Sequence, residues 1–448
     1  MDIDDRACNA LVGLLRTELP KIGLSLEGHA NIQDLLVVDE SFERKVQQLP
    51  QAAKQEILSC LGEHPFIALF FGEVEPQLAD VRSRGPTGRS LLCELPEFQD
   101  TEALANQMVE VVRGLPIRYA AMLKLPRCLT NKLIEQGIPP ILGPHISIVG
   151  SWHERQNGLP QQHPESLTNN ARNLVGQGLL SSFLKSPDQP SITSEHAAYL
   201  NIRLEGYCRS IFSNQVQKRF TYLLKSFFGL SLGCGILDTA WTGVTTDPHA
   251  MTLFEEMQES FIQCKAEQLD RSVTELLNKL TLNESSSLDF GGQIRMIIDV
   301  LNIEFARDGV PLARATRWLF DSRANPDTAM GFMQLAICVE VLLGTSIENE
   351  GITKTLSDRC AYLIANSAME RDSLIKEFRD IYQLRSKIVH NGLGAFKRKE
   401  HLQFQRLRAI CNRVVQRESE LLVADTESQL ERHVDSRRGR VHKEPISL

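Results

Sequence analysis

The feature that most constrains this chain is an amphipathic run near its C-terminus, from Met369 to Gly392. Apolar residues recur there mostly at steps of three and four, the spacing that places them on one face of an α-helix. They are Leu374, Ile375, Phe378, Ile381, Tyr382, Leu384, Ile388 and Val389. Asn391-Gly392 follows, and this pair tolerates the left-handed conformation with which helices commonly end. We therefore predict a long helix with one buried face and with His390 in its final turn.

Arg385 and His390 are the candidate catalytic residues of this helix. Arginine is always charged and can bind two phosphate oxygens, and histidine can exchange a proton near neutral pH. Five residues correspond to about 140° of helical rotation, so the two side chains diverge on an ideal helix. They can converge where the last turn unwinds, or where a second copy of the helix faces the first. The alternative is a surface arginine beside a histidine that interacts with the last helix carbonyls.

Two further apolar helices are expected before this one. The segment Met330 to Gly344 contains one carboxylate, Glu340, and a later segment contains Arg359. A lone carboxylate on an apolar helix needs a partner. We predict a structural salt bridge between Glu340 and Arg359, with a direct catalytic part as the alternative. Tyr382 is expected to serve in packing.

The order of these three segments resembles the HEPN superfamily, and within it the Apea-like HEPN group of bacterial defence proteins. The matching stretches read L-A-I-C-V-E-V-L-L, T-L-S-D-R-C-A-Y-L-I and I-Y-Q-L-R-S-K-I-V-H. The resemblance covers Pro311 to Asp425, roughly a quarter of the chain. The group's R-x4-6-H signature, with a polar residue after the arginine, is met by Arg385, Ser386 and His390. One departure is Asn391, which stands where the group usually has glycine.

The resemblance implies a C-terminal helical bundle that forms a homodimer or a higher homo-oligomer. It also implies a metal-independent endoribonuclease without a cofactor, a toxin of the abortive-infection type in antiviral defence. Its substrate would be RNA, with tRNA as one candidate, cut by attack of the 2′-hydroxyl at a cleft shared by two protomers. Arg385, Ser386 and His390 would be catalytic, and the supporting residues would be Glu340, Arg359, Tyr382 and Asn391.

Two other functions remain open at this point. HEPN modules also serve as non-catalytic dimerisation units or as sensors that bind a nucleotide or RNA. In that case Arg385 would hold an anion such as a phosphate. A third possibility is a scaffold in which the Arg–His spacing is a coincidence.

Charge is distributed unevenly along the chain. Residues 385–417 contain nine basic side chains and one acid, whereas residues 1–110 contain 19 acidic and 9 basic ones. A basic stretch beside the candidate site favours a polyphosphate backbone, and a solvated basic helix is the alternative. The predicted RNA-binding residues are Lys387, Lys397, Arg398 and Lys399. We expect the acidic N-terminal region to restrain the site until a phage component binds.

Composition excludes several other classes. No window contains 18 consecutive apolar residues, and the first residues, M-D-I-D-D-R, are acidic, unlike a signal peptide. We therefore expect a cytoplasmic protein with no membrane contact. The ten cysteines contain no C-x2-C pair and no histidines at zinc spacing, so no metal site is predicted.

The expected fold is mainly α, with an α+β N-terminal region and a C-terminal all-α HEPN-like helical bundle. The predicted divisions are a helical start plus α+β regulatory domain (1–150), a polar excursion and connecting helices (151–245), a helical linker (246–310), the HEPN-like domain (311–425) and a polar, basic, disordered tail (426–448).

The individual elements are predicted from periodicity and turn residues. The expected helices are Ala7–Leu19, Ser41–Leu49, Ala52–Leu61, Thr101–Gly114, Ala198–Phe228, Thr252–Leu282, Gln293–Phe305 and Ala313–Phe320, and the expected strands are Phe66–Phe71, Ser90–Leu95, Ile117–Leu125 and Ile146–Val149. The glycine-rich stretch Gly229–Gly243 is interpreted as a boundary, and the polar stretch Trp152–Ser194 as a surface excursion.

Overall fold

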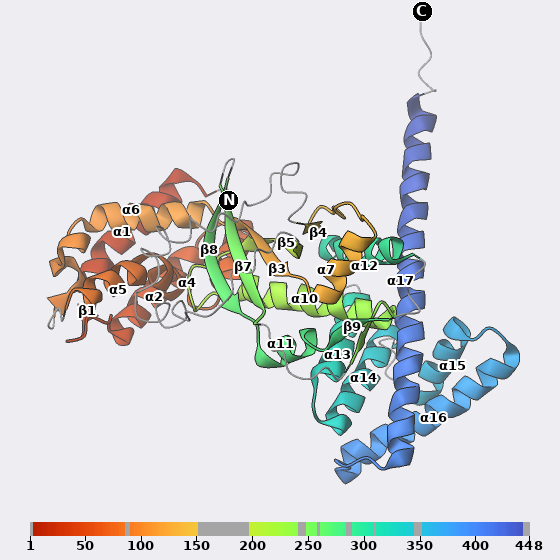
Figure 1. The fold of residues 1–448 in the computed structure, drawn as a ribbon. Helices are drawn as coiled ribbons and strands as arrows, with labels where there is room; N and C mark the ends of the chain where they lie inside the picture. Colours follow the sequence, from red (N-terminus) through yellow and green to blue (C-terminus); the bar gives the residue numbers. More distant parts are fainter. Residues whose placement is uncertain are drawn as a thin grey trace, which may run out of the picture.

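The protein is mostly helical, with one five-stranded sheet between two groups of helices (Figure 1). The computed structural model describes residues 3–85, 90–150, 197–240, 248–257, 260–283, 289–307, 311–344 and 352–441. The mainly α class expected from the sequence is therefore confirmed. The predicted polar excursion, residues 152–194, lies outside the described ranges.

The N-terminal helices bury a core of their own. They are α1 (Asp5–Glu18), α2 (Ile32–Val46), α3 (Gln51–Leu61), α4 (Pro65–Leu69), α5 (Glu75–Ser83) and α6 (Thr101–Arg113). Their core runs from Ile3 to Leu115 and also takes in Tyr207. The predicted helices at α1, α3 and α6 are confirmed. The helix start at Ser41 is wrong, because α2 begins at Ile32, where the Asn31 side chain accepts a hydrogen bond from the Gln33 amide at 3.0 Å.

The apolar run Phe66–Phe71, expected as a strand, is helical. Pro65 occupies the first turn of α4, and the Asp39 carboxylate accepts hydrogen bonds from the Phe66 amide at 2.8 Å and the Ile67 amide at 3.4 Å. A π-helical turn, Phe70–Val74, continues it. A short apolar run cannot distinguish a strand from a buried helix by periodicity alone, and here the cap decides. Of the strand expected at Ser90–Leu95, only β2 (Ser90–Leu91) forms, paired with β1 (Gly23–Leu24).

Within the described residues, no single helix is long and apolar enough to cross a membrane. Taken together, α3 and residues 65–83 have the length and the apolar composition of a membrane-spanning helix, but the two segments are bent by 56° relative to each other. Their most apolar residues, Phe66, Ile67 and Phe70, are buried in the N-terminal core.

The central sheet is antiparallel throughout, in the order β4-β5-β3-β7-β8. Its strands are β3 (Ile117–Lys124), β4 (Ile146–Gly150), β5 (Ala198–Gly206), β7 (Ala250–Met257) and β8 (Ser260–Gln268). The predicted strands at β3 and β4 are confirmed. The helix predicted over Thr252–Leu282 is wrong, because Met251–Glu255 pairs with β3 and then turns back as β8. Pairing with a buried neighbour overrides the helical preference of a stretch rich in Glu, Gln and Met.

The predicted helical linker at 246–310 is therefore wrong as well. It holds β7 and β8, then the short helix α11 (Arg271–Leu277) and β9 (Leu280–Leu282), which pairs with β6 (Leu237–Thr239). Helix α12 (Phe290–Arg307) is the helix expected at Gln293–Phe305. Helix α7 (Arg127–Glu135) follows β3.

Helix α10 (Gln215–Gly233) joins the sheet to the C-terminal helices. The helix expected over Ala198–Phe228 is thus half wrong, since its first part is β5. Gly229 and Gly233 do not mark a boundary. A Cβ at Gly229 would lie 2.0 Å from the Thr316 carbonyl oxygen, and one at Gly233 would lie 2.5 Å from Val415 Cγ1. The glycines let helices approach closely inside one hydrophobic core that extends from Tyr119 to Val415.

The C-terminal helices are α13 (Pro311–Ala324), α14 (Thr328–Leu343), α15 (Ile352–Ile364), α16 (Ala368–Asn391) and α17 (Arg398–Val441). Among them, α13 and α17 pack against α10 and α12, and α14, α15 and α16 pack in turn against α13, α17 and one another (Figure 1). The helix predicted at Ala313–Phe320 is confirmed in α13. The tail expected to be disordered from Thr426 is helical to Val441, because residues 426–438 contain neither glycine nor proline to stop α17. Residues 442–448 lie outside the description.

Candidate functional site

Helix α16 has the boundaries that the sequence predicts. The Ser367 side chain accepts a hydrogen bond from the Glu370 amide at 3.2 Å, and Glu370 accepts one from the Asn366 amide at 2.8 Å. This reciprocal arrangement satisfies amides that the first turn leaves without partners. At the other end, Gly392 has φ +63°, a left-handed conformation that closes the helix just after His390 and Asn391.

Arg385 is fixed by Glu340 of α14. The Arg385 Nε atom lies 2.8 Å from Glu340 Oε1, and Nη2 donates to Oε2 at 3.3 Å. The two side chains are 33% and 26% exposed. Only the Nη2 contact has hydrogen-bond geometry, and together with the short Nε–Oε1 ion contact it holds the guanidinium against the carboxylate. The remaining guanidinium donors of Arg385 are thus held in one direction, at a position that solvent reaches.

Tyr382 completes this arrangement. Its hydroxyl donates to Glu340 Oε1 at 3.1 Å, and its ring stacks on Phe378 with centroids 4.8 Å apart. Burial, and then the Glu340 charge, raise the pKa of the Tyr382 hydroxyl, which therefore stays a donor. Tyr382 packs in the core as expected, whereas its hydrogen bond to Glu340 could not be predicted from the sequence.

The predicted salt bridge between Glu340 and Arg359 is wrong. Arg359 Nη1 instead donates to the carbonyl oxygen of Leu343, at the end of α14, at 2.8 Å. The lone carboxylate correctly signalled that a partner exists. Glu340 pairs with Arg385 and not with Arg359 because α16 packs on α14, and this packing cannot be predicted from the sequence alone.

His390 lies further along α16 and is exposed, as are Ser386 and Asn391. Five residues separate Arg385 from His390, about 7.5 Å of helix and about 140° of rotation. Because α16 stays helical through Asn391, the last turn does not unwind to bring the two side chains together. Within one chain, the side chains of Arg385 and His390 therefore point in different directions.

The nine basic residues of 385–417 differ in their pairing, and five of them, Arg408 among them, have no ion pair among the described residues. Four have carboxylate partners within 4 Å: Arg385 with Glu340, Arg406 with Glu377, Arg413 with Glu370 and Arg417 with Glu420. The four predicted RNA-binding residues, by contrast, have exposed side chains and no ion pair among the described residues. They are Lys387, Lys397, Arg398 and Lys399. Their charge is available to an external anion.

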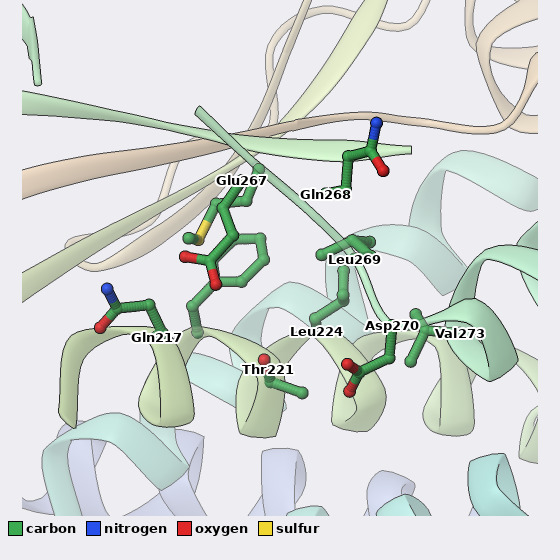
Figure 2. A pocket seen from close by; sticks show the side chains of 10 residues that line it. Gln217, Thr221, Leu224, Glu267, Gln268, Leu269, Asp270 and Val273 are labelled. Carbon is green, nitrogen blue, oxygen red and sulfur yellow. The ribbon is translucent and has the colours of Figure 1, made fainter. Parts of the chain in front are cut away.

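Two hollows lie away from these residues. One is small and lies between α10 and the segment from β8 to α11, and Gln217, Thr221, Glu267 and Asp270 line it (Figure 2). The other is an open groove between the N-terminal helices and the sheet, lined by Glu73, Arg209, Glu255 and their neighbours. None of the predicted site residues lines either hollow. Within the described ranges, no three or more His, Cys, Asp or Glu side chains gather as a metal site would require.

Comparison with known proteins gave no match, whether with protein-family models, curated proteins or solved structures.

Proposed function

We propose that the C-terminal helices α13–α17 form a HEPN-like domain, and that the protein is a metal-independent endoribonuclease. The observation that carries the proposal is Arg385, which Glu340 and Tyr382 hold half-exposed on the helix that ends at His390. A fixed cation stabilises a developing phosphorane charge without reorganising during the reaction. The exposed, unpaired side chains of the four predicted RNA-binding residues supply positive charge that attracts the phosphate groups of RNA; they are Lys387, Lys397, Arg398 and Lys399.

The proposed reaction needs groups from two protomers. The 2′-oxygen of the RNA attacks the adjacent phosphorus, the bond to the 5′-oxygen breaks, and a 2′,3′-cyclic phosphate and a 5′-hydroxyl form. His390 of one copy takes the 2′-hydroxyl proton, and the partner's His390 protonates the leaving oxygen. Ser386 orients Arg385 or a phosphate oxygen. Arg385 and His390 point in different directions on a single α16. In a homodimer in which two copies of this helix face each other, the arginine of one copy and the histidine of the other can reach the same phosphate.

The proposed setting is a cytoplasmic antiviral defence system in which the N-terminal region restrains the nuclease. Residues 1–110 contain 19 acids and 9 bases, the opposite balance to residues 385–417. An acidic unit that covers the basic surface would be displaced by a phage component. Removing the N-terminal region then makes the protein more toxic to its host, and equal toxicity of the two forms contradicts this part of the proposal.

The experiment that tests the proposal compares four full-length proteins on total RNA. Arg385→Ala and His390→Ala should each abolish the cleavage seen with wild type. Arg406→Ala is the matched control, because this arginine is also exposed and ion-paired but lies on α17. It should cleave at the wild-type rate. Equal cleavage by His390→Ala and wild type would overturn the assignment.

One observation favours a second function, a non-catalytic module that binds a nucleotide or RNA. Glu340 neutralises part of the Arg385 charge before any ligand arrives. RNA binding by wild type and by His390→Ala with equal affinity, without cleavage by either, would support this function. Loss of cleavage with retained binding in His390→Ala supports the nuclease.

A further inference from the structure

Two arginines meet at the opposite end of α14, where α13 ends and α17 begins. Arg323 lies in the last turn of α13, and its side chain is only 5% exposed. Arg408 lies in the third turn of α17 and is half-buried. Its guanidinium carbon lies 5.1 Å from the centre of the Phe404 ring. A Cβ at Gly331 of α14 would lie 3.5 Å from the ring of Phe404, one turn before Arg408, and the Gly331 carbonyl oxygen accepts a hydrogen bond from the hydroxyl of Ser322, the residue before Arg323. The two arginines therefore lie near one another, and burial and then the charge of Arg408 lower the pKa of Arg323.

Their negative partners do not balance this charge. Arg323 Nη1 donates to Asp238 Oδ1 at 3.3 Å and to Thr239 Oγ1 at 3.4 Å, and Asp238 is 59% exposed. Arg408 has no ion pair with any residue that the structure describes. The Nε atoms of both arginines are buried without a hydrogen-bond partner. Within the described part of the chain, the only carboxylate paired with these two guanidinium groups is thus solvent-exposed Asp238, and it pairs with Arg323 alone.

This arrangement costs free energy in the unliganded protein. Removing a cation from water is unfavourable unless an opposite charge and hydrogen bonds compensate it. Burial, followed by the charge of Arg408, lowers the pKa of Arg323 to about 10, and burial lowers the pKa of Arg408. An anion of charge −2 between the two guanidinium groups would remove their mutual repulsion.

We propose that Arg323 and Arg408 form a binding site for a phosphate monoester, held between α13 and α17 beside β6. Arginine matches the geometry of phosphate oxygens, and two arginines match the charge of a dianion better than that of a diester. The site is independent of the proposed ribonuclease site. Gly331 and Phe404 are neighbours here, and Glu340 is nine residues from Gly331, about 13 Å along α14.

Titration of the full-length protein with inorganic phosphate at constant ionic strength tests this site. Calorimetry should show binding to wild type and at least about tenfold weaker binding to Arg408→Gln, because a charge-assisted contact is lost. Arg406→Gln is the matched control, two residues away and paired with Glu377, and should bind as wild type does. Arg385→Gln should also bind normally, which separates this site from the proposed nuclease site.

A variant that should bind phosphate more tightly than wild type serves as a second test, because unfolding can only weaken binding. Asp238→Asn removes the competing carboxylate, so its affinity for phosphate should rise above that of wild type. Dimethyl phosphate, a monoanionic diester, should bind at least about tenfold more weakly than inorganic phosphate because of its lower charge. Equal binding by wild type and folded Arg408→Gln, no binding by wild type, or equal binding of the two phosphates would each overturn the proposal.

Discussion

The two ends of α14 differ in how far the charge of a neighbouring arginine is compensated by a carboxylate. Near its C-terminus, Glu340 pairs with Arg385 and accepts a hydrogen bond from Tyr382. Near its N-terminus, Arg323 pairs only with the exposed Asp238, and Arg408 has no carboxylate partner among the described residues. The first arrangement fixes a cation whose charge is partly compensated, and the second leaves cationic charge in excess. The difference shows that a basic residue count says little about anion binding until the carboxylate partners are known.

Removing the charge of Glu340 should have the largest effect on this comparison. Glu340→Gln releases the Arg385 guanidinium from its fixed direction, and a misplacement of about 1 Å lowers a rate by about 100-fold. We expect that loss in RNA cleavage with RNA binding unchanged, measured by single-turnover kinetics. Glu377→Gln removes the similar pair with Arg406 and should leave the rate unchanged. Equal rates for Glu340→Gln and wild type would show that the pair does not position Arg385.

The hydroxyl of Tyr382 should appear in the pH dependence of stability. Its pKa is raised in the folded protein, so above about pH 10 the unfolded chain loses this proton while the folded chain keeps it. The free energy of unfolding therefore falls as pH rises, by about 1.4 kcal/mol per pH unit from this group. Tyr382→Phe should make the decline shallower, by about 1 kcal/mol between pH 10 and 11 where the unfolded tyrosine is still partly protonated, in urea titrations. An unchanged slope would contradict the role of this hydroxyl.

Stability should respond in opposite directions when each end loses an arginine. Arg385→Met leaves Glu340 with Tyr382 alone, and we expect it to lower the free energy of unfolding by about 1 kcal/mol. Arg408→Met keeps contact with Phe404 while it removes repulsion, so stability should stay constant or rise slightly. Urea denaturation at neutral pH measures both. A loss of stability in Arg408→Met as large as in Arg385→Met would remove the distinction between the two ends.

The sequence predicted the helix of the candidate site well and the sheet poorly. The limits of α16 follow from local signals, the Ser367 cap and Gly392, that act within one turn. Strand β7 depends on pairing with β3, more than 120 residues earlier, and β8 pairs with β7, whereas the Glu- and Gln-rich sequence of both strands suggests a helix. Gly229 similarly looks like a boundary until Thr316 is found against it. Contacts between residues far apart in the chain leave no recognisable pattern in the local sequence.

The candidate site shows the same division. That Glu340 needs a partner followed from one carboxylate on an apolar helix, but its partner is Arg385 and not Arg359. Four of the five unpaired basic residues were predicted as a group, whereas the pairing of Arg406 and Arg413 was not. The excess charge at Arg323 and Arg408 was missed entirely, since these residues are 85 positions apart.

The chemical ends of the products test the central claim most directly. Wild-type protein would be incubated in EDTA with an RNA and with a DNA of the same sequence, and the product termini would be determined. We expect that only RNA is cut, leaving 2′,3′-cyclic phosphate and 5′-hydroxyl ends that are absent with His390→Ala. Cleavage of DNA, or RNA products with 5′-phosphate ends, would contradict attack by the 2′-hydroxyl at this site.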